Sequence, residues 1–386
     1  MSTLGRRQFL KTVSATTLAV GATPLRWRHA HAAEEIRIGA LCELSGPAST
    51  IGSQQALGMQ FAVDEINSAG GIKGRPVQLV FEDDKTTNPG AVAALQRLLE
   101  DREIAGVLGP IRSTQIQALL PTVNEAGLPV MIGGSNYGLT HSGSRWVFRT
   151  RPHDGFSARV IAKFAVDDLK FKKIAVIHST DAFGSGGRDL VVQELTKLGR
   201  PPVLVQGYNN GEKDFTAVLT AVRQSGADGL ITYMTFSTDV GIMAKQIKQL
   251  GIKAAWLGSP SITAIDGRKL AGDALYGTYG VTDFHADASP KSREFAAAYR
   301  AKHGSTPDLY AASSYDAMLV LAEAMRRAPD LRPDSIRTAI LGIQNFWGAE
   351  YVYNFDDNGD GLDHYHIVRN ENDAIKLFKT IRVPRS

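Results

Sequence analysis

Residues 44–84 read LSGPASTIGSQQALGMQFAVDEINSAGGIKGRPVQLVFEDD, and this stretch decides the fold of the chain. Apolar residues recur at helical spacing from Ala56 to Ile66, which predicts an amphipathic helix. Gly70 and Gly71 follow where a left-handed helix end requires glycine. A Lys-Gly turn then leads into an apolar run at 77–81, which predicts a strand. The stretch is therefore one helix–strand unit of a parallel α/β sheet.

The rest of the chain repeats this alternation. One set of predicted strands covers 37–41, 77–81, 106–108 and 129–132, and a second set covers 173–178, 203–207, 229–234, 254–257 and 276–281. Helical patterns separate most of them, among them 91–102, 114–126, 156–169 and 239–250. Alternating strands and helices are typical of parallel sheets with helices on both faces. Two sets of strands predict two such sheets.

The N-terminus predicts an exported protein. Residues 6–11 read RRQFLK and match the twin-arginine signal, although Gly5 stands where Ser or Thr is usual. The mildly apolar run at 13–22 is too short to span a membrane. Residues 30–32 read AHA, a cleavage motif that places the cut before Ala33. We expect 1–32 to be a twin-arginine signal peptide recognised by the twin-arginine export machinery, with the mature protein in the periplasm. The alternative is a disordered basic tail.

Composition excludes several classes of protein. The chain has 43 basic and 39 acidic residues, but 1–32 hold five of the basic residues and no acid, which leaves a net charge of −1 after cleavage. The basic balance therefore belongs to the N-terminus and gives no reason to expect nucleic-acid binding. The single cysteine, Cys42, excludes an internal disulfide and a cysteine-based metal cluster. It lies at a predicted strand end, where we expect a small buried residue.

Residues 44–84 also closely resemble, as a string, the opening of periplasmic binding proteins of the Leu/Ile/Val type. These are soluble receptors of ABC importers for branched-chain amino acids and related solutes. Shorter matches occur at 148–155 (FRTRPHDG), 181–186 (DAFGSG) and 211–215 (GEKDF). The resemblance implies an α/β fold with two doubly wound parallel-sheet lobes joined by a three-strand hinge. It implies that lobe 1 comprises 34–149 plus 283–345, and lobe 2 comprises 150–282 plus 346–386.

The loop before the predicted helix at 114–126 is a candidate ligand site. Ser113 could cap this helix, and the free N–H groups of a helix start attract anions such as a carboxylate. A capping serine without a ligand is the alternative. The resemblance implies that Ser113 and Thr114 hold a ligand carboxylate, and that Ser135 and Asn136, at the end of the next strand, converge on it. Arg112 could clamp a second acid group of the ligand, or it could be a solvated arginine at the rim.

Three apolar residues stand where relatives of this type have pocket tyrosines. Ile51 and Phe183 occupy two such positions, and Phe236 occupies the third. The resemblance implies that they line the pocket, whereas ordinary packing is the alternative. An apolar, Phe-lined pocket with anion-binding loops would also suit an aromatic or aliphatic carboxylate.

One departure concerns the ligand amine. In the relatives a glutamate after the strand equivalent to 254–257 pairs with the ligand ammonium, but this chain reads Ser-Pro-Ser at 259–261, which places Ser261 in the expected pocket. A buried ammonium without a counter-charge is costly. Asp181, Asp239 or Asp266 substitutes for the glutamate, or the ligand is not an α-amino acid.

Two motifs resemble metal sites. Residues 356–361 (DDNGDG) start like an EF-hand loop, but Ile367 stands where that loop requires Glu, so we expect a turn. His364 and His366 share one face of a predicted strand, but two ligands do not make a site. We expect no metal and no other cofactor. The sequence contains no G-x-S-x-G, H-E-x-x-H or Walker motif, and we identify no catalytic residues.

The sequence and the resemblance together predict a periplasmic receptor of an ABC importer. We expect it to be a monomer that binds a hydrophobic amino acid or a related small carboxylate by lobe closure and delivers it to an ABC permease. A receptor for aromatic or aliphatic carboxylates without an amine is one alternative. A ligand sensor that feeds a signalling partner is another, and a two-domain α/β enzyme is a third.

Overall fold

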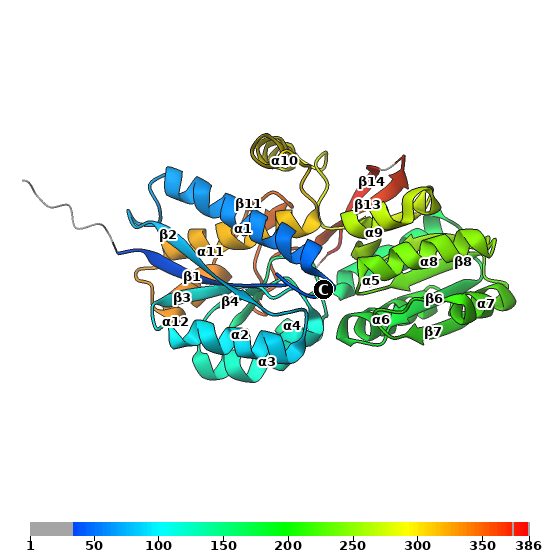
Figure 1. Ribbon diagram of the computed structural model, residues 1–386, viewed down its shortest axis with the longest axis horizontal. Coiled ribbons are helices and arrows are strands. Elements are labelled where there is room, and N and C mark those ends of the chain that lie inside the picture. The colour runs from blue at the N-terminus through cyan, green and yellow to red at the C-terminus, as the bar shows by residue number, and fades with distance from the viewer. Residues whose placement is uncertain (1–33, 373, 385–386) are drawn as a thin grey trace, which may run out of the picture. The chain divides into compact units, whose positions relative to one another are not determined.

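The computed structural model describes residues 34–372 and 374–384, which contain two large sheets (Figure 1). The first sheet is parallel throughout and has the order β2-β1-β3-β4-β5. Its strands are β1 (Ile36–Cys42), β2 (Val77–Asp83), β3 (Ile104–Leu108), β4 (Val130–Ile132) and β5 (Val147–Arg149). We call this sheet and the helices that pack on it lobe 1.

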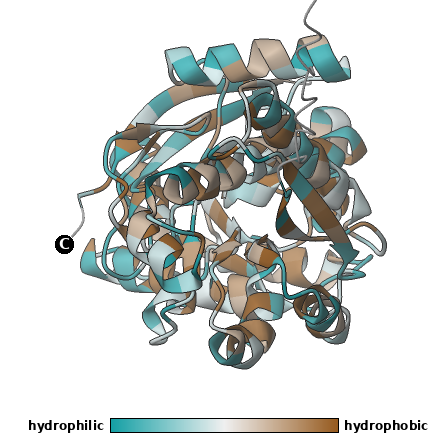
Figure 2. Ribbon diagram, turned by 90° about the vertical axis from the view of Figure 1, so that its left-hand side faces the viewer, coloured by the Kyte–Doolittle hydropathy of each residue, from teal (hydrophilic) through white to brown (hydrophobic). Residues whose placement is uncertain are grey.

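Helices cover both faces of the first sheet, as its apolar strands require. α1 and α11 lie on one face, and α2 and α3 lie on the other (Figure 1). The helices of lobe 1 are α1 (Ser49–Ser68), α2 (Asn88–Glu100), α3 (Ser113–Ala126), α4 (Gly138–His141), α10 (Pro290–His303), α11 (Leu309–Arg327) and α12 (Pro333–Leu341). Figure 2 shows that these helices carry both hydrophobic and hydrophilic residues, which is the pattern of helices that bury one face.

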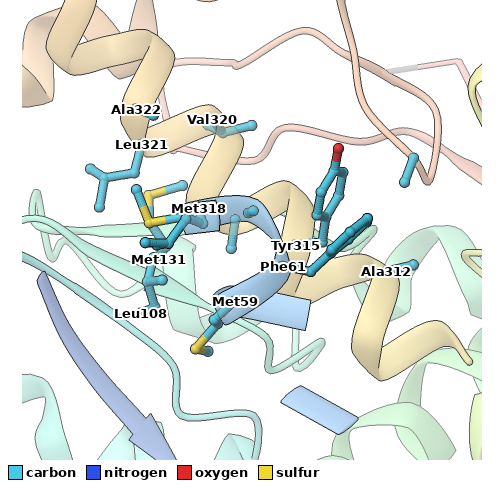
Figure 3. Packing of buried hydrophobic residues seen from close by; sticks show 14 of the residues in the cluster. Met59, Phe61, Leu108, Met131, Ala312, Tyr315, Met318, Val320, Leu321 and Ala322 are labelled. Atoms are coloured by element: carbon cyan, nitrogen blue, oxygen red, sulfur yellow. The ribbon is translucent and has the colours of Figure 1, made fainter. Parts of the chain in front are cut away.

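The core of lobe 1 forms between α1, α11 and the sheet. Met59 of α1 and Met318 of α11 pack with Leu108 of β3 (Figure 3). Phe61 stacks on Tyr315 with ring centroids 5.6 Å apart. The helical spacing of the apolar residues in 44–84 is thus the buried face of α1, as predicted.

The second sheet has seven strands in the order β14-β13-β10-β9-β8-β6-β7. Five of them are parallel, whereas β13 and β14 are antiparallel additions at one edge. The strands are β6 (Ile174–Ser179), β7 (Leu204–Tyr208), β8 (Gly229–Tyr233), β9 (Ala255–Gly258), β10 (Tyr279–Thr282), β13 (His364–Glu371) and β14 (Ala374–Arg382). We call this sheet and its helices lobe 2.

The helices of lobe 2 also pack on both faces of their sheet. They are α5 (Asp154–Lys163) with a π-helical turn at Phe164–Asp168, α6 (Ala182–Lys197), α7 (Thr216–Ser225), α8 (Ser237–Gln249) and α9 (Ile265–Ala271). Short 3₁₀ turns at Pro260–Thr263 and Gly272–Leu275 flank α9. No helix in the described part of the chain is long and apolar enough to cross a membrane.

The sequence-based strands and helices are confirmed with shifts of a few residues at their ends. The prediction of two doubly wound lobes is confirmed as well. The sequence did not predict the antiparallel edge of the second sheet. It also did not predict the short hairpin of β11 (Phe346–Trp347) and β12 (Val352–Tyr353). Three connecting stretches, 150–153, 283–289 and 342–363, run between the elements of the two lobes. The lobe boundaries at 149/150, 282/283 and 345/346 stay a prediction.

Candidate functional site

The two sheets bring the carboxyl ends of their parallel strands to a common cavity. In lobe 1 the loops after β3 and β4 contribute, and in lobe 2 the loops after β6, β8 and β9 contribute. In each sheet the strand order reverses at this point, because β2 and β3 flank β1, and β7 and β8 flank β6. Doubly wound α/β folds bind ligands at such topological switch points.

Polar and apolar side chains mix on the walls of this cavity. The lobe 1 side, with the first connecting stretch, is formed by Ile111, Arg112, Ser113, Ser135, Arg151 and Tyr310. The lobe 2 side is formed by Asp181, Phe183, Met234, Thr235, Pro260 and Ser261. A larger hollow lies beside Glu35 and Asp101, but at the amino ends of β1 and β3. The cavity between the lobes is therefore the candidate ligand site.

Ser113 begins α3 rather than capping it. The helix runs from Ser113, its N-cap residue is Arg112, and no side chain caps this helix start. The prediction that Ser113 caps a helix from Thr114 was therefore wrong, because the helix starts one residue earlier. The first hydrogen bond of the helix runs from the Ile116 N–H to the Arg112 carbonyl at 3.0 Å. The N–H groups of 113–115 come before it and therefore have no partner within the helix. The Ser113 side chain lines the cavity and accepts a hydrogen bond from the Asn136 N–H at 3.3 Å.

Thr114 and Asn136 join the two lobes instead of lining the cavity. The Thr114 hydroxyl accepts a hydrogen bond from the Ala182 N–H at 3.2 Å, and the Asn136 amide donates to the Ala182 carbonyl at 2.7 Å. Both backbone groups of Ala182, at the start of α6, are thus bonded to lobe 1. Ser135, the neighbour of Asn136, does line the cavity, so the loops after β3 and β4 converge there.

Each of the three guanidinium nitrogens of Arg112 makes a hydrogen bond within the protein. Its Nε and Nη2 donate to the two carboxylate oxygens of Glu43 at 2.5 and 3.0 Å, and its Nη1 donates across the cleft to the Thr235 carbonyl at 2.9 Å. Burial alone would lower the pKa of Arg112, but the Glu43 carboxylate raises this pKa above its usual value. The side chain is 11% exposed. Arg112 is thus not a solvated rim arginine; two of its five N–H groups keep no partner in these three bonds, so the clamp on a second acid group stays a prediction.

The three apolar residues that replace tyrosines take different positions. Phe183 lines the cavity and lies 5.9 Å from the Tyr233 ring. Phe236 is half-buried, and the Arg112 guanidinium lies over its ring at 5.1 Å. Ile51 is only 2% exposed and packs in the core of lobe 1. The structure therefore brings only Phe183 of the three to the cavity wall.

The segment that lacks the expected glutamate does reach the cavity. Pro260 and Ser261 line it, and Ser261 lies 3.3 Å from the Ser259 hydroxyl. Among the three substitute acids, Asp181 lines the cavity, and it is the one acidic residue among the described lining residues. Asp239 is buried within lobe 2, where it accepts a hydrogen bond from the Gly211 N–H at 2.9 Å, and Asp266 lies on α9 outside the lining set.

Asp181 is held firmly in place. It is the N-cap of α6, and its Oδ1 accepts from the Gly184 N–H at 2.9 Å and from the Ser179 hydroxyl at 3.1 Å. Its Oδ2 accepts from the Asn210 amide at 2.7 Å. A carboxylate oxygen has more than one acceptor position, so these bonds orient Asp181 and leave capacity for a cationic ligand group.

Sequence reasoning missed six lining residues, namely Ile111, Arg151, Met234, Thr235, Pro260 and Tyr310. Arg151 donates to the Asp283 carboxylate and to the Gly133 carbonyl, the latter at 3.1 Å. Its guanidinium also lies over the Tyr310 ring at 5.7 Å. Tyr310 lies in the first turn of α11, far along the chain from the other lobe 1 contributors, and no local sequence signal marks it.

The metal-like motifs have structural roles. Asp360 pairs with the buried Arg149 at 2.7 Å, and the Asp356 carboxylate accepts hydrogen bonds from the N–H groups of Asn358 and Asp360. The turn predicted for this segment is therefore confirmed. His364 and His366 are buried on β13 with ring centroids 4.9 Å apart. Within 34–372 and 374–384, no group of three or more His, Cys, Asp or Glu side chains could hold a metal ion.

Two sheet-based lobes with a cavity at their switch points define a two-lobed α/β binding protein. Residues 35–366 match the family model described as periplasmic binding protein. The chain therefore belongs to the periplasmic binding protein family, which is periplasmic. Members of this family are binding proteins and not enzymes.

Relatives agree with this assignment along most of the chain. An amino acid binding protein of Pseudomonas aeruginosa is 30% identical over 81% of this chain and 83% of its own length. The leucine-, isoleucine-, valine-, threonine- and alanine-binding protein of the same organism is 26% identical over 85% of this chain and 88% of its own length. Among solved structures, the leucine binding protein LivK of Thermotoga maritima has a TM-score of 0.84 at 24% identity, covering 90% of this chain and 99% of that one. The similarity to that structure shows the fold.

Proposed function

We propose that this protein binds a hydrophobic α-amino acid in the cavity between its lobes and delivers it to an ABC permease. The observation that carries the proposal is the placement of Ser113 and Asp181 on opposite walls of one cavity. A helix start with free N–H groups suits the ligand carboxylate, and an oriented carboxylate suits the ligand ammonium. The names of the Pseudomonas relatives, which bind amino acids, support the same ligand class.

The apolar body of the ligand has matching walls. Ile111 and Phe183 face the cavity from lobe 1 and lobe 2, and Met234 and Pro260 add further apolar surface. Because thioether and aromatic groups adapt to branched aliphatic side chains, leucine, isoleucine and valine are the preferred candidates. The roles of Ser135 and Ser261 are to hydrogen-bond the polar end of the ligand. Thr114, Asn136 and Arg112 contribute by holding the lobes together around it.

Binding by lobe closure follows from the contributions of both lobes. A ligand that bridges two lobes stabilises the closed state only through the contacts that it makes there and not in the open state. We propose that the protein acts as a monomer, because the cavity is completed within one chain. We also propose export through the twin-arginine route, with cleavage before Ala33.

Isothermal titration with L-leucine, L-isoleucine and L-valine tests the ligand class directly. Saturable binding of at least one of them, together with a decrease in the radius of gyration measured by small-angle scattering, is expected. Ser113→Ala should weaken that binding. Binding of 4-methylpentanoate or an aromatic acid with none of the three amino acids bound would contradict the proposal in favour of a non-amino carboxylate.

A further inference from the structure

A cluster of buried ionisable side chains joins the three stretches that connect the lobes. Arg151 lies in the first stretch, Asp283 in the second, and Glu350 and Tyr353 in the third. Asp316 of α11 adds a third carboxyl, and this one comes from lobe 1. None of the five is more than 5% exposed. The cluster therefore occupies the place where a relative rotation of the lobes must be accommodated.

Three oxygen atoms surround the single hydroxyl of Tyr353. Its Oη lies 2.8 Å from Glu350 Oε2, 3.0 Å from Asp316 Oδ2 and 3.0 Å from the Thr150 carbonyl. A phenol has one proton to donate, so it cannot satisfy two ionised carboxylates at these distances. The carbonyl of Thr150 has no proton to contribute. A second proton is therefore needed, and it must reside on Glu350 or Asp316.

The hydrogen bonds of the two carboxyls place this proton on Glu350. Asp316 accepts backbone N–H groups on both oxygens, from Ala349 at 2.6 Å and from Glu350 at 2.8 Å, which suits an anion. Among the described residues, the Glu350 carboxyl has one hydrogen-bond partner, Tyr353, and its Oε1 is buried without one. A neutral acid tolerates such a site far better than a carboxylate does. Glu350 thus donates to Tyr353, and Tyr353 donates to Asp316.

The other charged and titratable groups around Glu350 are compatible with this assignment. Burial raises the pKa of Glu350 well above its usual value, the charges of Asp283 and Asp316 raise this pKa further, and Arg151 opposes them. Burial also raises the pKa of Asp316, to about 7, against its backbone hydrogen bonds. From β13, burial lowers the pKa of His366 to about 3, and burial lowers that of His364 as well. These two imidazoles are therefore neutral and supply no counter-charge near pH 7.

We propose that Glu350 is protonated in the folded protein and that this proton stabilises the hinge. The stability of the hinge therefore depends on pH. When protonated, Glu350 bonds Tyr353 and leaves the Tyr353 proton for Asp316, which ties the third stretch to α11. When ionised, it places a new negative charge beside Asp316 and Asp283 and competes for Arg151. Since Arg151 also lines the ligand cavity, this competition reaches the binding site. The inference does not depend on which ligand the protein binds.

The sign of the effect follows from proton linkage. The pKa of Glu350 is higher in the folded than in the unfolded protein, so the folded protein holds the extra proton between these two values. The stabilisation is complete below the unfolded pKa and is lost as the pH rises through the folded pKa. One linked proton changes the unfolding equilibrium constant by at most about tenfold for each pH unit in that window.

Glu350→Gln tests the proposal, because the glutamine amide has the shape of the acid and donates to Tyr353 at every pH. The unfolding constants of the wild-type and variant proteins are measured by urea titration from pH 5 to pH 9. We expect the wild-type constant to rise relative to that of Glu350→Gln by up to about tenfold per pH unit. Glu103→Gln, an exposed control, should follow the wild type. Parallel curves for the wild type and Glu350→Gln would overturn the proposal.

Two measurements on the wild type keep the proposal testable if the variant does not fold. Infrared spectroscopy at pH 7 should show the carbonyl band of a protonated carboxyl, and the absence of any such band would exclude a neutral Glu350. Small-angle scattering without ligand should give a larger radius of gyration at pH 9 than at pH 6. An unchanged radius would exclude the coupling between this proton and the hinge.

Discussion

Arg112 and Glu43 form a bidentate ion pair, and the third guanidinium nitrogen of Arg112 makes a hydrogen bond across the cleft. Two guanidinium nitrogens meet the two Glu43 oxygens at 2.5 and 3.0 Å, and the third bonds the Thr235 carbonyl of lobe 2 at 2.9 Å. The Phe236 ring lies under the same guanidinium. Glu43 follows β1 and is fully buried, so it fixes the arginine from lobe 1. The pair therefore fixes the guanidinium from lobe 1 and uses three of its five N–H groups, while Nη1 and Nη2 each keep one further N–H.

Removing the arginine should be more damaging than removing both charges. Arg112→Met leaves the Glu43 carboxylate buried without a partner, and we expect a loss of about 3–5 kcal/mol in the free energy of unfolding at pH 7. Combining it with Glu43→Gln should restore part of this loss. Urea denaturation measures both. Arg145→Met, which breaks an exposed pair with Asp334, should cost less than about 1 kcal/mol. Equal losses for the single and double variants would contradict this account.

A glycine in the middle of α1 should resist replacement by a better helix former. A Cβ added to Gly58 would lie 2.1 Å from the Ala311 carbonyl oxygen of α11. Alanine gains about 1 kcal/mol in helix propensity, but separating two packed helices costs about 1–3 kcal/mol or more. We therefore expect Gly58→Ala to lower the melting temperature. Ser53→Ala, at an exposed position of the same helix, should leave it nearly unchanged. A melting temperature raised by Gly58→Ala would show that the helices can separate freely.

The export prediction concerns residues outside the described part of the chain. Replacing Arg6 and Arg7 together by Lys preserves the charge but removes the twin-arginine pattern. We expect the precursor to accumulate in the cytoplasm, and cell fractionation measures this. Normal accumulation in the periplasm would rule out the twin-arginine route without affecting the receptor assignment.

Local patterns predicted the fold well because the period of apolar residues reports which face of an element is buried. The helix of 44–84 and both sets of strands could be located in this way. The antiparallel pair β13–β14 could not, since pairing direction depends on distant parts of the chain. The same limit applies to the site. Ser113, Ser135 and Phe183 follow strand ends, where parallel sheets gather their loops, and they line the cavity.

The partners of the charged site residues could not be predicted. Glu43 lies 69 positions from Arg112, and Asp283 lies 132 positions from Arg151. No sequence period links residues so far apart, so a buried ion pair and a free ligand clamp have the same local pattern. The sequence likewise left three candidates for the acid that would pair with the ligand ammonium, namely Asp181, Asp239 and Asp266. Only the packing of lobe 2 separates the one that faces the cavity from the two that do not.

The choice of Asp181 leads to the most discriminating prediction. Asp181→Asn removes the negative charge but retains the helix cap, because asparagine caps helices as well as aspartate does. If Asp181 holds the ligand ammonium, the variant loses one charge-assisted hydrogen bond to leucine. The binding free energy should then weaken by about 1.5–3 kcal/mol, which corresponds to roughly a 10- to 150-fold lower affinity. Binding of 4-methylpentanoate, which has the same carbon chain and no amine, should not weaken. Calorimetric titration of the wild type and the variant with both ligands measures the difference.

Asp189→Asn provides the matched control, since Asp189 lies on the same helix and its side chain is 70% exposed. It should bind both ligands as the wild type does. Equal losses for leucine and 4-methylpentanoate in Asp181→Asn would show that Asp181 shapes the cavity without contacting the amine. If the wild type binds 4-methylpentanoate at least as tightly as leucine, the amine is not recognised at all. In that case the segment at 259–261 has changed the ligand class to carboxylates without an amine. Ser113→Ala should still weaken binding, because both ligands present a carboxylate to the start of α3.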